Sequence, residues 1–263
     1  MRFSLPHIPI KKKCVVLSAV LLLCFAVTGI VQVAAAAASG GSTNQGLHFE
    51  RIFPFYRVFL NGLADTLELT ILSLIGGFIL GTLLSVVKVS RFRLLALLAR
   101  FYTSVFRGTP LLVQLFLVYF ATPQLTGYKI PPVTAAVITF ALNSGAYVSE
   151  ILRGGIQSID RGQSEAALAL GVRSKNVMFD IIIPQALKTV LPALVNEGIA
   201  LLKDSSLVST IGMLDLMRSA QVSMNVTYLA FEPFILVALV YYILVMALTF
   251  VANRLERRLR RSD

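Results

Sequence analysis

Long apolar runs separated by short basic segments dominate the 263-residue chain. In chain order, the runs cover residues 14–37, 62–87, 97–120, 131–150, 186–203 and 231–252, and the third is interrupted at "RGTP" (107–110). Each approaches the roughly 20 residues that cross the hydrocarbon core of a bilayer as a helix. A helix is required because lipid offers the backbone no hydrogen-bonding partner. The pattern therefore predicts an all-α integral membrane protein of about six transmembrane helices.

Composition supports this prediction. Hydrophobic residues make up 56% of the chain and charged residues only 14%, whereas a soluble domain carries about a quarter charged residues. The net charge of +11 could indicate a nucleic-acid partner. The basic residues cluster beside the apolar runs, however, and no nucleic-acid-binding motif is present. Sorting of basic loops to the cytoplasmic side explains the excess better.

The lysines and arginines also predict the topology. With the N-terminus inside and six alternating spans, five of the 24 basic residues lie outside, Arg107 lies within a span, and the remaining eighteen lie inside. The five outside are Arg51, Arg57, Lys129, Lys203 and Arg218. This asymmetry places the 164–188 segment and the C-terminus in the cytoplasm.

The first run allows two interpretations. Three lysines precede it and "AAAAASGG" (34–41) follows it, which fits either a signal anchor or a cleaved signal peptide. Removing the segment would leave five spans and would not change the orientation of the rest. We therefore divide the chain into an N-terminal segment with an outer linker, 1–56, and a membrane domain, 57–263.

The segment "SEAALALGVRSKNVMFDIIIPQALK" (164–188) is too polar to cross a bilayer and too apolar for an ordinary loop. Asp160 with Gln163 forms a capping-box pattern that predicts a helix up to Gly171. Ser174 is expected to cap a second short helix, which should end at Pro184.

Two cytoplasmic helices over 160–183 are thus expected, lying along the inner face of the membrane. Helices this short are marginal alone and need a partner for their apolar faces. That partner could be another protein, the chain's own spans or the lipid interface.

Polar residues at membrane depth are costly and usually face a cavity or a partner. Asn143, Tyr147 and Glu150 share one face of the fourth span. The candidate substrate contacts are Gln114, Asn143, Glu150, Glu197 and Asp204. Together with nearby basic residues they offer both signs of charge, which suits a zwitterionic solute. Alternatively these groups pair with one another, and Glu150–Arg153 is a candidate ion pair.

Two glycines, Gly77 and Gly81, have the G-x-x-x-G spacing that lets helices approach closely, either within one subunit or across a dimer. On the outer side, "YKIPPV" (128–133) and residues 38–56 are candidate surfaces for an extracytoplasmic binding protein.

A longer motif resembles a known family. It is similar to the EAA motif of permease subunits of ATP-binding cassette importers. The matching residues are Glu165-Ala166-Ala167, then Gly171 after three residues, then Ile181, Ile183 and Pro184. The family has Leu where Ile183 stands. "FRGTPLLVQLFLVYF" (106–120), "AYVSEILRGGIQSI" (146–159), "IPQALK" (183–188) and "LLKDSSLVSTIG" (201–212) resemble the polar amino-acid (histidine/glutamine/arginine) subfamily. The similarity runs from about residue 57 to the C-terminus.

The resemblance implies a type I importer permease fold, with five core spans plus an N-terminal one, in the cytoplasmic membrane. The 160–183 segment would be the coupling helix that docks into an ATPase subunit. The implied coupling residues are Glu165, Ala166, Ala167, Leu168, Gly171 and Pro184. The implied partners are two ATPase subunits, a second permease subunit and a solute-binding protein. Glu197 departs from the subfamily pattern and would favour a cationic amino acid if it lines the cavity.

Other functions remain open at this stage. The chain has no phosphate-binding G-x-x-x-x-G-K-[ST] run, Ser-His-Asp set or metal-ligand cluster, so we expect neither enzymatic activity nor a cofactor of its own. An ion-coupled secondary carrier that uses Glu68 and Glu197 is one alternative, although we find no inverted repeat. A membrane sensor docked to an ATPase is another.

Overall fold

The computed structural model describes residues 47–90 and 92–260, and the regular elements in these ranges are all helical. The predicted first span, 14–37, lies outside the described residues. From His48 onward the described residues form one unit. Its first half contains α2 (Tyr56–Val89), α3 (Arg93–Gly108), α4 (Leu111–Phe116), α5 (Thr122–Thr126) and α6 (Pro132–Gln157). Its second half contains α7 (Arg161–Ala169), α8 (Ser174–Asn176), α9 (Ile183–Asp204), α10 (Leu216–Thr227) and α11 (Phe231–Arg260).

Within the described ranges, four helical segments are long and apolar enough to cross a membrane. They are Phe49–Val89, Pro132–Gln157, Ser174–Ile211 and Phe231–Arg257. These segments contain the predicted runs at 62–87, 186–203 and 231–252 and cover the run at 131–150 from its second residue, and each extends beyond its run at one end or both. The four corresponding sequence predictions are therefore confirmed.

The third predicted span is bent. Arg93–Gly108 and Leu111–Thr126 meet at 106°, at the interruption that the sequence predicts for 107–110. Pro110 explains the position of the bend, because a proline disfavours helical geometry in the preceding residue. Thr109 accordingly has extended backbone angles, φ −119° and ψ 145°. If the bent pair counts as one span, the described residues hold five, which is the number of core spans that the family resemblance implies.

Glycines bring α2 and α6 into close contact. A Cβ atom on Gly77 would lie 2.7 Å from the Cβ of Ser144, and one on Gly81 would lie 2.6 Å from the Cβ of Val148. Neither position has room for a side chain. The predicted role of the Gly77/Gly81 spacing is confirmed as a contact within the subunit.

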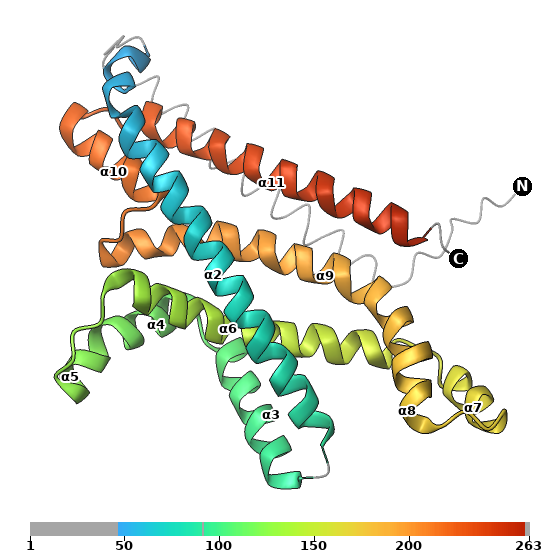
Figure 1. Ribbon diagram of the computed structural model, residues 1–263. Helices are drawn as coiled ribbons and strands as arrows, with labels where there is room; N and C mark the ends of the chain where they lie inside the picture. The colour runs from blue at the N-terminus through green and yellow to red at the C-terminus, as the bar shows by residue number, and fades with distance from the viewer. Residues whose placement is uncertain (1–46, 91, 261–263) are drawn as a thin grey trace, which may run out of the picture. The chain divides into compact units, whose positions relative to one another are not determined.

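The main hydrophobic core lies where α2, α4, α6 and α9 meet. Leu69, Leu115, Phe140 and Leu201 are all buried there. In Figure 1, α2 crosses α6 and α9, while α11 runs alongside α9. The α7–α8 hairpin lies beyond the ends of α6 and α9 that the basic residues assign to the cytoplasm. The core therefore holds the membrane helices together and leaves the hairpin at one end.

Candidate functional site

The first arm of the hairpin is α7, and both of its ends are capped. The Asp160 carboxylate accepts a 2.6 Å hydrogen bond from the backbone N–H of Gly162, which confirms Asp160 as the N-cap. At the other end, Gly171 N–H donates to Leu168 O at 3.0 Å and Val172 N–H donates to Ala167 O at 3.1 Å. This pair of bonds is a Schellman motif. It requires the left-handed backbone that Gly171 adopts, with φ +81°.

A small apolar cluster fixes the hairpin to the rest of the chain. Ala167 is buried against Val177 and Ile182. Partly buried apolar side chains surround these three, namely Ile156, Ile159, Val172 and Ile181. Ala167 therefore holds the two arms together instead of facing a partner. The hairpin is packed as a unit although each arm is short.

The second arm differs from the sequence prediction in two ways. Ser174 is the first helical residue and does not cap it; the N-cap position is Arg173, which makes no side-chain capping bond. Pro184 does not end the helix, because α8 continues through a π-helical turn, Val177–Ile182, directly into α9. A π-turn is a local adjustment by which a helix accommodates a proline and re-satisfies freed backbone groups. The hairpin is consequently joined to a transmembrane helix without a loop.

The outer surface of the hairpin is apolar and uncovered. Glu165, Ala166 and Leu168 are exposed along α7, and Leu170 is 85% exposed at its end. Phe179 on the π-turn is also exposed. We call these five residues the hairpin surface. Exposed apolar groups gathered in this way mark an interaction site.

Two of the predicted substrate contacts support the bend of the third span. The Gln114 side-chain amide donates to Phe106 O at 2.8 Å and to Thr109 O at 3.1 Å. Asn143 on α6 donates to Gln114 Oε1 at 3.0 Å and to Phe106 O at 3.1 Å. These bonds satisfy carbonyl groups that the broken helix leaves free. Gln114 is thus occupied in fixing the bend between α3 and α4.

A cavity of about 510 Å³ lies between α4, α6 and α9. Its lining includes three predicted contacts, Asn143, Glu197 and Asp204, together with Tyr147. Glu197 and Asp204 are seven residues apart and therefore share one face of α9. We call this space the α6–α9 cavity. It presents two carboxylates, an amide and an aromatic ring to a small polar solute.

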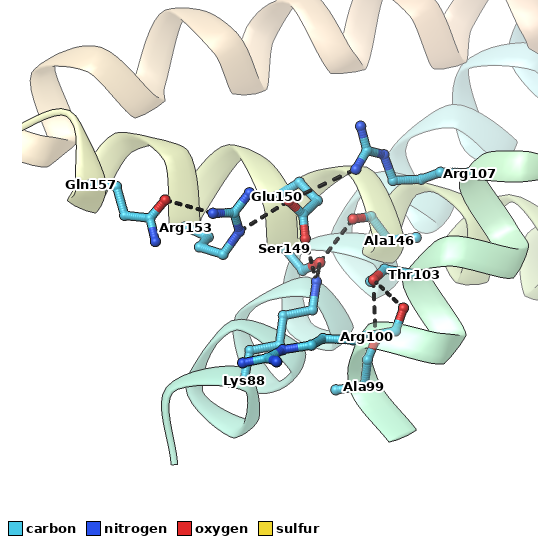
Figure 2. Close-up of polar contacts among 10 residues, drawn as sticks. All are labelled: Lys88, Ala99, Arg100, Thr103, Arg107, Ala146, Ser149, Glu150, Arg153 and Gln157. Atoms are coloured by element: carbon cyan, nitrogen blue, oxygen red, sulfur yellow. Dashed lines mark hydrogen bonds and ion pairs between the residues drawn. The ribbon is translucent and has the colours of Figure 1, made fainter. Parts of the chain in front are cut away.

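Glu150 lies in a separate pocket near the C-terminal end of α6. Its Oε1 atom is 2.6 Å from Lys88 Nζ, and its Oε2 atom is 2.6 Å from an Arg153 guanidinium nitrogen. Arg107 approaches the same carboxylate at 3.8 Å. Figure 2 shows Glu150 between Arg107 and Arg153, with Lys88 reaching it from α2. The predicted Glu150–Arg153 ion pair is confirmed.

Sequence reasoning missed the parts played by Lys88 and Arg107. Lys88 is a buried partner of Glu150, with its side chain 3% exposed. Arg107 lies 5.4 Å from the centroid of the Tyr147 ring and also approaches Glu150, so it links the two pockets. The signal for Arg107 was available, because a charge inside a span seldom lacks a partner. For Lys88 the sequence carries no such signal, because a buried lysine and an exposed lysine that marks the inner side of the membrane look the same at the end of an apolar run.

Comparison with known proteins identifies the family. A sequence profile of the family described as "Binding-protein-dependent transport system inner membrane component" matches residues 73–261. The chain belongs to this family. The arginine transport system permease protein ArtQ of Bacillus subtilis (strain 168) is 50% identical to the permease, covering 82% of this chain and 99% of ArtQ. The glutamine transport system permease protein GlnP of Escherichia coli (strain K12) is 38% identical, covering 80% and 96%.

Solved structures agree with this assignment. An amino acid ABC transporter crystallised with histidines has a TM-score of 0.79 and 43% identity, covering 81% of the permease and all of that chain. The inward-facing MetNI methionine transporter has a TM-score of 0.65 at 22% identity, over 78% of the permease and 98% of that chain. The second likeness supports the type I importer fold alone. The family favours an ATP-driven importer over the ion-coupled carrier.

Proposed function

We propose that the permease imports a polar amino acid across the cytoplasmic membrane, driven by ATP hydrolysis on a separate subunit. One observation carries the proposal: an exposed EAA hairpin continues without a loop into the helix that lines the α6–α9 cavity. The relatives' names, which concern arginine and glutamine, support the class of substrate.

The geometry suggests how movement reaches the cavity. A subunit that grips the hairpin surface pulls on a packed unit, because Ala167, Val177 and Ile182 hold both arms together. The π-turn transmits this displacement to α9, and the short connection at 158–160 transmits it to α6. Both helices line the cavity, so tilting them changes which side of the membrane the cavity faces. Rocking of this kind is how alternating access operates around a fixed site.

The partners follow from the same proposal. The hairpin surface would dock into an ATPase subunit, with Glu165 meeting a basic group and Ala166, Leu168 and Leu170 entering an apolar groove. A second permease subunit, two ATPase subunits and a solute-binding protein complete the assembly. Residues 128–133 and 38–56 are candidate surfaces for the binding protein. We place the C-terminus in the cytoplasm, and we assign 57–263 as the permease domain and 1–56 as a signal segment and linker.

Uptake into proteoliposomes tests the function. The full chain, reconstituted with its ATPase and binding protein, should accumulate labelled arginine or glutamine only when ATP is supplied to the ATPase side. Vanadate should stop this accumulation because it blocks ATP hydrolysis. Uptake that a protonophore abolishes and vanadate does not affect would refute the proposal in favour of an ion-coupled carrier.

Glu197 is expected to favour cationic substrates. Replacing it with glutamine removes one negative charge from the α6–α9 cavity and keeps the size of the side chain. We expect KM for arginine to rise about tenfold, corresponding to about 1.4 kcal/mol, and KM for glutamine to change little. Competition uptake with both labelled amino acids measures this shift.

The matched control is Glu68→Gln, which removes a carboxylate from an exposed position on α2 that does not line the cavity. It should leave the arginine-to-glutamine ratio unchanged. An equal change of the ratio in both variants would mean that the membrane charge in general, and not Glu197, sets the preference.

A further inference from the structure

A second cavity lies at the cytoplasmic end of the unit, apart from the α6–α9 cavity. It measures about 680 Å³ and is formed by the ends of α2, α3 and α6. Its charged lining residues are Lys88, Arg100, Arg107, Glu150 and Arg153, and Thr103 and Ser104 add hydroxyl groups. We call it the basic pocket. The basic pocket has no part in the transport function proposed for the α6–α9 cavity.

The charges of the basic pocket do not balance. Four cations line it against one carboxylate, and both oxygens of that carboxylate are already engaged. The nearest guanidinium nitrogen of Arg107 is 3.8 Å from Glu150 Oε2, so this pair is the weakest in the cluster. Arg100 has no ion pair within the described part of the chain. The pocket therefore presents an excess of positive charge that an anionic ligand would neutralise.

The surroundings of the pocket are apolar and uncovered. Along α3, the side chains of Leu94, Leu97, Leu98 and Phe101 are each more than half exposed, with Leu94 at 70%. They lie on the same helix that supplies Arg100 and Arg107. An anionic group in the pocket could thus be joined to hydrocarbon lying along α3. This combination fits an amphiphile better than a water-soluble anion.

We propose that the basic pocket binds the phosphate headgroup of an anionic phospholipid from the cytoplasmic leaflet, whose acyl chains lie against α3. Guanidinium groups match phosphate oxygens with paired hydrogen bonds. Basic pockets between transmembrane helices on the cytoplasmic side suit anionic headgroups, and each cation near the surface adds to the attraction. The proposal does not depend on the transported substrate, so it stands or falls separately from the proposed function.

Native mass spectrometry of the full-length permease, purified in detergent with the subunits that accompany it, tests the proposal. Phosphatidylglycerol is titrated against phosphatidylcholine, and the dissociation constant of each retained lipid is measured. We expect phosphatidylglycerol to bind more tightly. Arg100→Gln should weaken it about fivefold, and Arg100→Gln with Arg107→Gln by more than tenfold. Thermal unfolding should be unchanged in Arg100→Gln, because Arg100 has no ion pair among the described residues.

The control is Arg93→Gln, an exposed cation at the start of α3 that does not line the pocket. Weakening by Arg93→Gln equal to that by Arg100→Gln would overturn the proposal, because the effect would then be general attraction to the surface. Equal binding of the two lipids would overturn it as well. Displacement of phosphatidylglycerol by an equal concentration of inorganic phosphate would show a site for free phosphate instead of lipid.

Discussion

Gly171→Val is expected to uncouple ATP hydrolysis from uptake while leaving the permease in the membrane. The backbone of Gly171 has φ +81°, and a β-branched residue there costs roughly 1–2 kcal/mol because its side chain crowds the backbone. Among the described residues, no atom beyond the two chain neighbours lies within 4 Å of where its Cβ would be, so the effect acts through the backbone. The Schellman turn would open and displace Leu170 from the hairpin surface. We expect coupled uptake to fall about tenfold or more.

Gly171→Asn provides the matched control for this prediction. Asparagine tolerates the left-handed conformation better than other residues with a side chain, and the open space accommodates it. It should retain most of the uptake that the valine variant loses. Uptake per ATP hydrolysed, measured in proteoliposomes of known permease content, distinguishes uncoupling from loss of protein. Equal and undiminished uptake in both variants would contradict the proposal that the hairpin transmits movement of the ATPase to α6 and α9.

The membrane helices were predictable because each depends on local properties of the chain. Apolar runs marked 62–87, 131–150 and 231–252, and the helices found at these places are longer than the runs. The bend at Pro110 was predictable for a similar reason, since a proline restricts the residue before it. Even the close contact of α2 with α6 had a local sign in Gly77 and Gly81.

The same local rule was wrong at Pro184. Proline breaks an α-helix when its ring meets the carbonyl group four residues earlier. In this chain a π-helical turn precedes the proline and changes that register. Nothing in the residue types of 177–182 announces a π-turn. As a consequence, the hairpin is an extension of α9 instead of a separate element, and the proposed coupling relies on this continuity.

The five predicted substrate contacts do not lie together in one site, because their partners come from distant parts of the sequence. Their common property in the sequence was polarity at membrane depth, which indicates a partner without saying which one. The Gln114 side chain donates hydrogen bonds to carbonyl groups at the bend, and Glu150 pairs with Lys88, which is 62 residues away in the sequence. Asn143, Glu197 and Asp204 reached a common cavity because α6 and α9 pack together. Pairings of this kind depend on which helices pack together, so the sequence of one segment does not predict them.

The ion cluster around Glu150 joins three elements, α2, α3 and α6, through charged side chains. Lys88 comes from the end of α2, Arg107 from the end of α3, and Glu150 with Arg153 from α6. The Lys88 side chain is 3% exposed, and it also donates a 2.9 Å hydrogen bond to Ser149. A buried ammonium group without its carboxylate would be strongly unfavourable. Arg153 is 40% exposed and remains accessible to water without Glu150.

Glu150→Gln is therefore expected to destabilise the permease by about 3–5 kcal/mol, because it leaves Lys88 buried without a counter-charge. The apparent unfolding temperature of the purified protein should fall by roughly 10 °C. Lys88→Met with Glu150→Gln should recover most of this loss, since the buried charge goes with its partner. Arg153→Gln, which removes the exposed partner of the same carboxylate, should cost no more than about 1 kcal/mol. Lys88→Met alone, with the wild type, Glu150→Gln and the double variant, completes a double-mutant cycle that measures the coupling between Lys88 and Glu150. If the double variant is no more stable than Glu150→Gln alone, the carboxylate stabilises the cluster through something other than neutralising Lys88.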